Sequence, residues 1–591
     1  MFVSFKKSGK ALQPELNYET EPTEYYHEND NYRLFIDSNL PPESIKAKCA
    51  VSETDLVALS DYLRQDGVLI AFDKRSSEIT VARDNAGLCA VYFYATADEL
   101  VFCTNQHRIA RLKKTPLLRA EVVQWLALDF LWDGHTFYKD IRQVLVNQQL
   151  IFGSDFKLKS DKWEALEFTR DDNTFSEEEN IKRLRTEIVN AHRIYVREKN
   201  IVFLSGGIDS VAMLIALDDL VEKKGIENHA FKVKSTEQDE TEYAKSIADH
   251  LHTEIKIIER DITNEVTTDI FRNKVVRLNN PYAGIWIFAN QVTSGAEKVY
   301  YAGQDTRLHT PSLNAVDQVA FAFFGATSRV KWLVKLLDLI AKPVQALFDT
   351  LILRGILKKR AFIGLRRLSY ITNPEEYVLK YYFKIDKSYF RKMGLPDAFY
   401  EEARKNYSID LSGVYSRRGL YNYIVSKKWK EQYVNDIRYM VDMVKEQGGR
   451  LAMPFYNIPL TQFSAGIPFK QANKSITGRA QFSDETVKIN KFILREALRD
   501  KINDKTYYRA KAVSSTFHII YNMALAKVLK AVIAEDTKRE DSMIKRLGLS
   551  GFLQPFLSRE TYEIEHGPYL LKVYEVCCVI VFAEQIDYKM E

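Results

Sequence analysis

The feature that most constrains this chain is an apolar strand that runs into a glycine-containing turn and then into a helix. The residues are Ile201-Val202-Phe203-Leu204 followed by Ser205-Gly206-Gly207-Ile208-Asp209-Ser210. Glycines in such a turn let backbone N–H groups close around an anion without a side-chain clash. A helix that begins near Asp209 points its free N–H groups and the positive end of its dipole at the same place. The pattern therefore predicts a phosphate-binding loop at the end of a strand.

Polar side chains within the loop support the same prediction. The hydroxyls of Ser205 and Ser210 can donate hydrogen bonds to phosphate oxygens, and the Asp209 carboxylate can hold a magnesium ion that bridges phosphates. The loop is not a Walker loop, because the pattern GxxxxGK[ST] is absent from it. The loop alone does not identify the substrate of the reaction.

Strands and helices alternate on both sides of this loop. Ser176 followed by Glu179 fits a capping box at the start of a helix, and short apolar strands are separated by amphipathic stretches. This alternation predicts an α/β domain with a parallel sheet. The expected elements are a helix over 177–197, a strand over 200–204, a helix from about 209, a strand over 230–234, a helix over 240–252 and a strand over 254–258.

The chain before this alternating region and the chain after it have two different patterns. The first 170 residues contain several short, closely spaced strands, which predict stacked antiparallel sheets. From about 315 to the end the sequence predicts mainly helices, with 315–450 as a helical insert. We therefore predict the fold class α/β. Residues 1–170 would form a β-rich α+β domain, and 177–591 would form a parallel-sheet domain with a large helical C-terminal part.

Composition excludes several classes of protein. A net charge of +5 over 591 residues is too small to indicate a nucleic-acid-binding protein. The five cysteines lack CxxC spacing, and the beginning of the sequence lacks the apolar run of a secretory signal. No apolar run reaches the length of a membrane span. We therefore expect a cytoplasmic protein.

A basic, amphipathic segment lies near 330–360. It indicates either contact with a membrane surface or an acidic partner, or else a helical subdomain with a solvated basic face. Pro343 and Gly355 interrupt its pattern, which favours the solvated subdomain over one long interfacial helix.

Three motifs together resemble the asparagine synthetase family. The loop Ser205–Ser210 resembles the pyrophosphate loop of ATP pyrophosphatases of this type, and Glu240–Ala248 resembles the family's E-x-x-Y-A-x-x-x-A helix. Asn490–Ala497 resembles its K-x-x-L-R-E-A helix, and is followed by Tyr508–Ala512. The resemblance implies ATP and Mg²⁺ as cofactors and transfer of AMP rather than of the γ-phosphoryl group.

The resemblance also implies roles for individual residues. Lys511 would face an acyl-adenylate as the catalytic lysine, and Asp305 would join Asp209 as a magnesium ligand. Where the family has a G-x-G-x-D-E loop, however, the corresponding loop of this chain, Gly303–Pro311, has Asp305 as its only acid. The residues expected to bind the nucleotide are Leu204, Ser205, Gly206, Gly207, Ile208, Asp209, Ser210, Val233 and Gly303.

The N-terminal region resembles the glutaminase half of the same family. Asp84–Tyr94 and Gly134–Ile141 match its strand and turn patterns. Glutaminases of this kind use an N-terminal cysteine as the nucleophile. Here the sequence begins Met1-Phe2 and the first cysteine is Cys49, so only cleavage before Cys49 would supply that group. The resemblance therefore implies an Ntn-hydrolase-like domain that is degenerate and structural.

Three functions remain open at this stage. The first is an AMP-forming ligase that joins a substrate carboxylate to a substrate amine, as in β-lactam synthetases and lasso-peptide cyclases, where the product is a lactam or macrolactam. The second is an amidating enzyme fed by free ammonia or by a partner. The third is a nucleotide-binding pseudoenzyme that acts as a scaffold.

Overall fold

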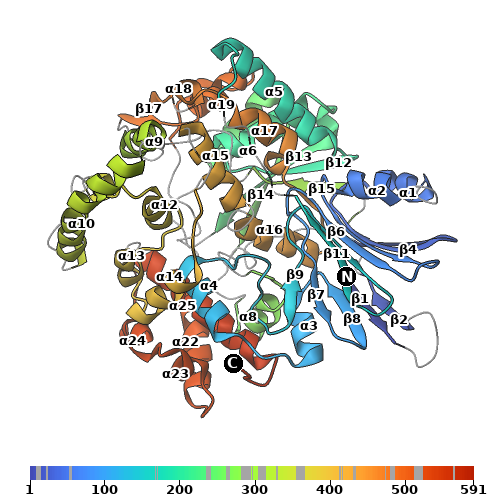
Figure 1. Cartoon of the computed structure of the whole chain (residues 1–591). Helices are drawn as coiled ribbons and strands as arrows, with labels where there is room; N and C mark the ends of the chain where they lie inside the picture. The colour runs from blue at the N-terminus through green and yellow to red at the C-terminus, as the bar shows by residue number, and fades with distance from the viewer. Residues whose placement is uncertain are drawn as a thin grey trace.

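The structure is a computed structural model, shown in Figure 1. It describes the chain except for residues 8–14, 21–23, 52–55, 165, 167, 169–170, 234–240, 261–265, 281–294, 296, 304–314, 328–330, 354–365, 412–413, 415–416, 430–433, 473, 480–485, 511–522 and 563–565.

Two antiparallel sheets form the N-terminal region, as predicted. The first has the strand order β2-β1-β8-β7-β9 and the second the order β11-β10-β6-β5-β4-β3. Their bounds are β1 Phe2–Lys6, β2 Glu15–Glu19, β3 Glu24–Glu28, β4 Tyr32–Asp37, β5 Val68–Asp73, β6 Ile79–Arg83, β7 Tyr92–Ala95, β8 Glu99–Cys103, β9 Ile141–Gln143, β10 Gln148–Phe152 and β11 Leu158–Trp163. The helices beside them are α1 Pro42–Val51, α2 Leu56–Leu63, α3 Gln106–Lys113 and α4 Arg119–Leu128.

The two sheets pack face to face. Alternate residues of β1, such as Val3 and Phe5, share a buried cluster with Ile70 and Phe72 of β5. The ring centroids of Phe5 and Phe72 lie 5.7 Å apart. The period-2 alternation of apolar residues thus gives each sheet an inner face, which the other sheet covers.

The second region contains a parallel sheet with the order β14-β13-β12-β15-β16, and all four of its pairings are parallel. Its strands are β12 Lys199–Phe203, β13 Ile226–Val233, β14 Glu254–Arg260, β15 Lys298–Tyr301 and β16 Leu451–Ala452. The expected alternation is confirmed by α5 Glu177–Arg193, α6 Ile208–Asp218 and α7 Thr241–Leu251. The Ser176 hydroxyl caps α5 by accepting from the Glu179 N–H at 3.1 Å.

The chain after this alternation is mainly helical where the structure describes it. One small hairpin, β17 Ile476–Arg479 and β18 Thr486–Ile489, interrupts the helices. The helices are α8 Thr268–Val275, α9 Ala315–Thr327, α10 Lys331–Leu353, α12 Pro374–Tyr382, α13 Lys387–Lys392, α14 Asp397–Asn406, α15 Arg417–Lys428, α16 Val434–Glu446, α17 Ile458–Ala465, α18 Phe469–Ala472, α19 Phe492–Ala497, α20 Asp504–Tyr507, α22 Met523–Thr537, α23 Met543–Leu547, α24 Ser550–Ser558 and α25 Gly567–Glu584.

The expectation that Pro343 interrupts the basic segment is wrong. Helix α10 is 23 residues long in all, and Pro343 lies within it. Proline removes one N–H donor from the helix, so the carbonyl four residues earlier, at Leu339, loses its helical partner. Both Leu339 and Pro343 are exposed, so water can satisfy that carbonyl. Gly355 lies outside the described residues.

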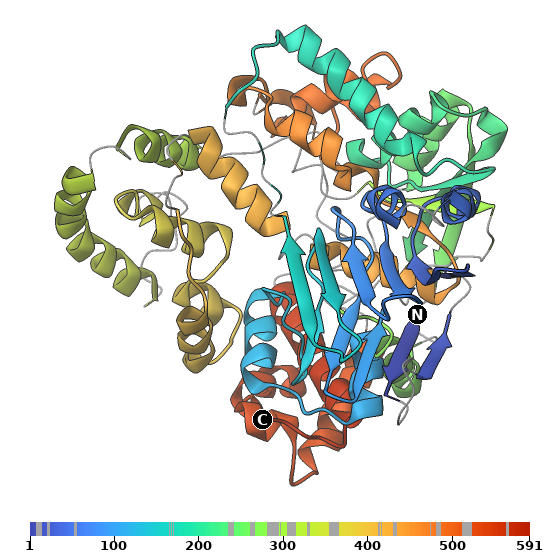
Figure 2. The same ribbon diagram turned by 45° about the vertical axis from the view of Figure 1, so that its right-hand side comes forward.

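None of the helices that the structure describes is both long enough and apolar enough to cross a membrane. Figures 1 and 2 show the parallel sheet with its helices beside the two N-terminal sheets, while α10 lies at the periphery of the molecule.

Candidate functional site

The site lies where the order of the parallel sheet reverses direction. From β12 the sheet continues on one side through β13 and β14, and on the other side through β15 and β16. The loop after β12 and the residues after β15 therefore meet at the carboxyl edge of adjacent strands. Open parallel sheets bind ligands in the crevice at such a topological switch point.

Gly206 gives the loop its shape. Its φ of +68° lies in the left-handed region. A Cβ at this position would lie 2.7 Å from the carbonyl carbon and Cβ of Tyr243 and 2.8 Å from the Ala244 nitrogen, at the beginning of α7. Two separate constraints, conformation and close backbone approach, thus require glycine here.

Serine hydroxyls hold the turn internally. The Ser205 N–H donates to the Ser210 hydroxyl at 3.2 Å, and that hydroxyl donates to the Gly207 carbonyl at 3.0 Å. The Gly207 N–H donates to the Ser205 hydroxyl at 3.3 Å. Gly207 is the N-cap of α6, so the helix begins directly at the loop, with Ile208 as its first residue. The first N–H groups of a helix have no intrahelical acceptor, which makes this end a site for an anion.

Gly303 closes the other side of the site. It follows β15, and a Cβ here would lie 2.4 Å from the carbonyl oxygen of Asp209 and 2.8 Å from the nitrogen of Ser210. Only a residue without a side chain lets the chain after β15 approach the first turn of α6 this closely. The predicted Gly303 is therefore brought against the predicted loop.

A partly buried ion pair lies at the same helix end. The Lys491 ammonium donates to both carboxylate oxygens of Asp209 at 2.6 Å. The two side chains are only 16% and 15% exposed. Lys491 has a φ of +65° and precedes α19 directly. Its position compensates the charge of Asp209 when no nucleotide is bound.

The segment after α19 also contacts the loop. Buried Arg495 donates to the carbonyls of Thr506 at 3.1 Å and Arg509 at 3.0 Å, which fixes the path of the chain between them. Arg509 in turn donates to the Ser205 carbonyl at 3.2 Å, and its guanidinium lies 4.0 Å from the Tyr243 ring centroid. Burial lowers the pKa of Arg495 to about 10. Three cationic groups thus lie near the loop, which suits an anionic ligand.

The predicted site residues fall into three groups. The loop residues Leu204–Ser210 and Gly303 are brought together. Val233 ends β13, the strand adjacent to β12, and its backbone pairs with Arg260. Asp305 and Lys511 lie outside the described residues, so their assigned roles remain predictions.

Sequence reasoning did not assign a role to Lys491 or Arg509. Both lie in the runs that resemble family motifs, and Lys491 is the first residue of the K-x-x-L-R-E-A pattern. Lysine and arginine are common on any protein surface, so these residue types did not by themselves indicate a functional role. The contact with Asp209 depends on residues 282 positions apart.

The donor set is compatible with a magnesium ion carried by a nucleotide. Among the described residues, no group of three or more His, Cys, Asp or Glu side chains is arranged to hold a metal. Magnesium is usually bound by one or two carboxylates together with phosphates and water, so a dedicated cage is not needed. Asp209, at the helix end that would face the phosphates, suits that role.

Cys49 does not have the setting of a nucleophile. It lies within α1, is fully buried and belongs to an apolar cluster. Burial raises the pKa of its thiol to about 11, which disfavours the reactive thiolate. The other four cysteines are also buried.

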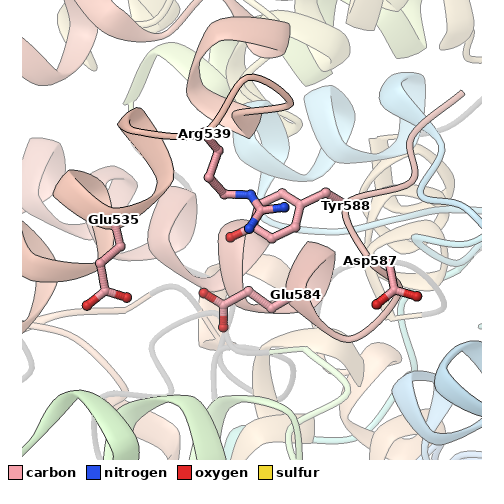
Figure 3. A pocket seen from close by; sticks show the side chains of 5 residues that line it. All are labelled: Glu535, Arg539, Glu584, Asp587 and Tyr588. Atoms are coloured by element: carbon pink, nitrogen blue, oxygen red, sulfur yellow. The ribbon is translucent and has the colours of Figure 1, made fainter.

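A separate open pocket of about 410 Å³ lies between the C-terminal helices. Figure 3 shows its lining, in which the Arg539 guanidinium lies 3.7 Å from the Tyr588 ring centroid, beside Glu535, Glu584 and Asp587. Arg272 pairs with Glu535 at 2.6 Å and with Glu584 at 2.9 Å. The acidic lining is thus partly neutralised, and none of the loop residues lines this pocket.

Comparison with known proteins agrees with the geometry of the loop. The family model described as asparagine synthase matches residues 190–289, which contain β12, the loop and α6. Residues 190–289 are thus similar to the asparagine synthase family.

A curated relative supports this family assignment. The putative asparagine synthetase (glutamine-hydrolyzing) 2 of Methanocaldococcus jannaschii is 26% identical over 192 residues. The match covers 31% of this chain and 36% of that protein. The chain thus spans about a third of the length of this relative.

Proposed function

We propose that this protein is an ATP-dependent ligase that activates a substrate carboxylate by adenylation and joins it to an amine. The observation that carries the proposal is the loop at the switch point of the parallel sheet. There Gly206 lets the beginning of α7 approach the loop, and Gly303 lets the chain after β15 approach the first turn of α6. The match of residues 190–289 to the asparagine synthase family supports the same reaction class.

In this proposal the loop binds ATP as a pyrophosphate loop of the synthetase type. The first turn of α6 binds the pyrophosphate through its N–H groups, and the adenine lies near Val233. The Asp209 carboxylate, with Asp305 as the second acid, would hold a magnesium ion that offsets the charge of the phosphates. Lys491 would leave Asp209 and donate to the phosphates, since both groups attract the same ammonium.

The reaction is the attack of a carboxylate oxygen on the α-phosphorus, with release of pyrophosphate. An amine then attacks the acyl carbon, loses a proton, and AMP departs with the former carboxylate oxygen. Lys511 would stabilise the charge on the tetrahedral centre. The protein mainly contributes orientation and fixed charge, which together are worth many orders of magnitude in rate.

The source of the amine follows from the N-terminal region. We propose that the two stacked sheets form a degenerate Ntn-hydrolase-like domain, because Cys49 is buried in a helix. Without a cysteine nucleophile this region would not release ammonia from glutamine. The amine would then belong to the substrate, and peptide macrolactam formation is the form of the reaction we favour.

Two other functions use the same site. Amidation of a small molecule with free ammonia or with ammonia from a partner would need no substrate amine. A nucleotide-binding scaffold would bind ATP without cleaving it, and the presence of one acid in place of an Asp-Glu pair after Gly303 favours that function. The intact packing of Gly206 and Gly303 favours an enzyme instead.

The test is to incubate the purified protein with Mg·ATP labelled at the α-phosphate and candidate carboxylates, including precursor peptides encoded beside its gene. Formation of AMP and pyrophosphate in equal amounts would establish adenylation. ADP in place of AMP would overturn the proposed use of the loop. ATP binding without cleavage, with every substrate, would favour the scaffold. Ammonium-dependent AMP formation would identify the amidating enzyme.

A further inference from the structure

The guanidinium of Arg495 connects the two segments that bring cations to the phosphate-binding loop. Arg495 lies within α19 and is 5% exposed. On one side its Nε donates to the carbonyl of Asn490, the residue before Lys491, at 3.1 Å. On the other side its Nη1 and Nη2 donate to the carbonyls of Tyr507 at 2.5 Å and Arg509 at 3.0 Å. One buried side chain thus holds both segments.

The geometry of this connection is specific to arginine. Nη1 also donates to the Thr506 carbonyl at 3.1 Å, so the guanidinium donates to backbone carbonyls of both segments at once. Thr506 and Tyr507 end α20, where helix carbonyls have no partner within the helix. A lysine ammonium presents its N–H groups from a single atom, whereas the guanidinium is a wide planar fork. The positive charge by itself would therefore not reproduce the connection.

Lys491 adopts a backbone conformation that is unfavourable for a residue with a side chain. Its φ of +65° lies in the left-handed region, at a cost of about 1–2 kcal/mol. Such a conformation persists where the surrounding structure determines it, and it is often found at functional sites. The bond from Arg495 to the Asn490 carbonyl fixes the peptide group that precedes Lys491. Arg495 thus holds the strained residue whose ammonium contacts Asp209.

Arg509 is held at the other end of the connection. Its carbonyl accepts from Arg495, and its own guanidinium donates to the Ser205 carbonyl at 3.2 Å. The same guanidinium lies 4.0 Å from the ring centroid of Tyr243, whose backbone is the group that approaches Gly206. Arg509 therefore contacts both the loop and the beginning of α7, which packs against the loop.

We propose that Arg495 is a positioning residue for the binding of the nucleotide phosphates, an inference that rests on the proposed function of the loop. Arg495 acts through its neighbours: it fixes Lys491 beside Asp209 and Arg509 beside Ser205, so that both cations are in place before phosphate binds. Charged groups that are fixed in advance stabilise an anion more than groups that must become ordered when it binds. Loss of the Arg495 guanidinium should therefore weaken phosphate binding although Lys491 and Arg509 are still present.

A purely structural role for Arg495 predicts a different pattern. A buried carbonyl that loses its donor destabilises the fold, so any substitution of Arg495 should lower stability. If that were the only effect, the folded variant would bind phosphate as the parent protein does. The effect of the substitution would also be the same with and without Lys491. The phosphate affinity of the folded variant, and its dependence on Lys491, therefore distinguish the two roles.

The experiment is calorimetric titration of the full chain with Mg·ATP and with magnesium pyrophosphate. Arg495→Lys keeps the charge but loses the fork that spans both segments. We expect its dissociation constants for both probes to rise at least about tenfold. The matched control is Arg499→Lys in the same segment, where the arginine side chain is 41% exposed and pairs with Asp504 at 2.8 Å. The control should bind both probes within about twofold of the parent.

A double-mutant cycle tests whether Arg495 acts through Lys491. In the Lys491→Ala background, Arg495→Lys should weaken Mg·ATP binding only about threefold, because one of the two positioned cations is already absent. Arg509→Gln is a second variant, which leaves the bonds from Arg495 to the backbone in place. It should weaken the binding of both probes at least about fivefold. This variant tests the proposal even if circular dichroism shows that Arg495→Lys does not fold.

Three outcomes would overturn the role of Arg495 while the parent protein still binds both probes. One is that folded Arg495→Lys binds them as tightly as Arg499→Lys does. Another is that Arg495→Lys has the same effect with and without Lys491. The third is that Arg509→Gln binds both probes as the parent does. If instead the parent bound neither Mg·ATP nor magnesium pyrophosphate, the proposed function of the loop would fail, and the role of Arg495 with it.

Discussion

The Lys491 ammonium lies 2.6 Å from both carboxylate oxygens of Asp209, and thereby links the start of α19 to the first turn of α6. Both side chains are largely buried, so their attraction is screened less than that of a surface pair. Each partner is therefore positioned by the other at the site where phosphates are proposed to bind.

Replacing either partner should impair adenylation. Asp209→Asn removes the proposed magnesium ligand and should lower AMP formation at least about 100-fold, the order reported for losing one key electrostatic contact. Lys491→Ala leaves Asp209 without its cation and should raise the KM for ATP and lower kcat. The measurement is AMP release at saturating and limiting ATP.

The matched control is an ion pair at the other end of α6. Lys501 donates to Asp218, the last residue of α6, at 2.8 Å. Lys501→Ala should leave both kinetic constants within about twofold of the parent, since its pair is remote from the loop. Equal losses in Lys491→Ala and Lys501→Ala would contradict the role given to Lys491.

Gly206 and Gly548 provide a pair that separates backbone strain from close approach. Their φ values are +68° and +70°, so Ala at either position should cost about 1–2 kcal/mol of stability. A Cβ at Gly206 would collide with the backbone of Tyr243, whereas one at Gly548 would meet no atom within 4 Å. Only Gly206→Ala should therefore abolish nucleotide binding, as measured by calorimetric titration with Mg·ATP. Normal ATP affinity in Gly206→Ala would contradict this prediction, because it would show that the loop accommodates the added Cβ.

Asp66 should make stability depend on pH in a defined direction. Burial and the nearby Asp84 raise the pKa of Asp66 to about 7, although Asn39 donates to both of its oxygens. Between pH 4 and 7 the unfolded chain has lost this proton while the folded protein keeps it. This group therefore stabilises the fold at low pH, and its contribution is lost as pH rises through that window.

Asp66→Asn should remove that dependence. The free energy of unfolding of the variant minus that of the parent should increase as pH rises from 4 to 7, because only the parent loses stability over this range. Urea unfolding at several pH values measures the difference between the two proteins. Parallel pH profiles would contradict the raised pKa.

Lys572 should be a large contributor to stability. It is buried in α25 and contacts Asp129, at the end of α4, and Glu575, the latter at 2.8 Å. Burial raises the pKa of the Glu575 carboxyl to about 8. Lys572→Met removes the ammonium that lies between these two buried carboxylates, leaves Asp129 with the longer ion pair to Lys384 at 3.8 Å, and should cost about 3–5 kcal/mol.

A second substitution tests this explanation. Asp129→Asn in the Lys572→Met background removes a carboxylate that has lost the Lys572 ammonium, and should recover part of the loss, as measured by denaturant unfolding of the single and double variants. Equal stability of the two variants would mean that lost packing of the lysine stem, rather than charge, causes the loss.

Much of the fold followed from local pattern. The strand–helix alternation between Glu177 and Arg260 gave elements of the correct type in the correct order, because each period of apolar residues suits one kind of backbone. The hydroxyl of Ser176 caps α5 as its spacing from Glu179 predicts. The prediction that Pro343 interrupts the segment was wrong because the effect of a proline inside a helix depends on its surroundings. The helix continues where water can reach the carbonyl that loses its hydrogen-bond partner.

The sequence alone determined the loop, its glycines and the nature of the chemistry proposed for it, since strand, turn and helix are adjacent in the chain and their residues interact locally. Tertiary structure alone decided what surrounds the loop. It brought Lys491 to Asp209, Gly303 to the first turn of α6, and Arg509 to the Ser205 carbonyl. These relationships join distant segments, and the packing of whole elements fixes them, which no local period of the sequence records.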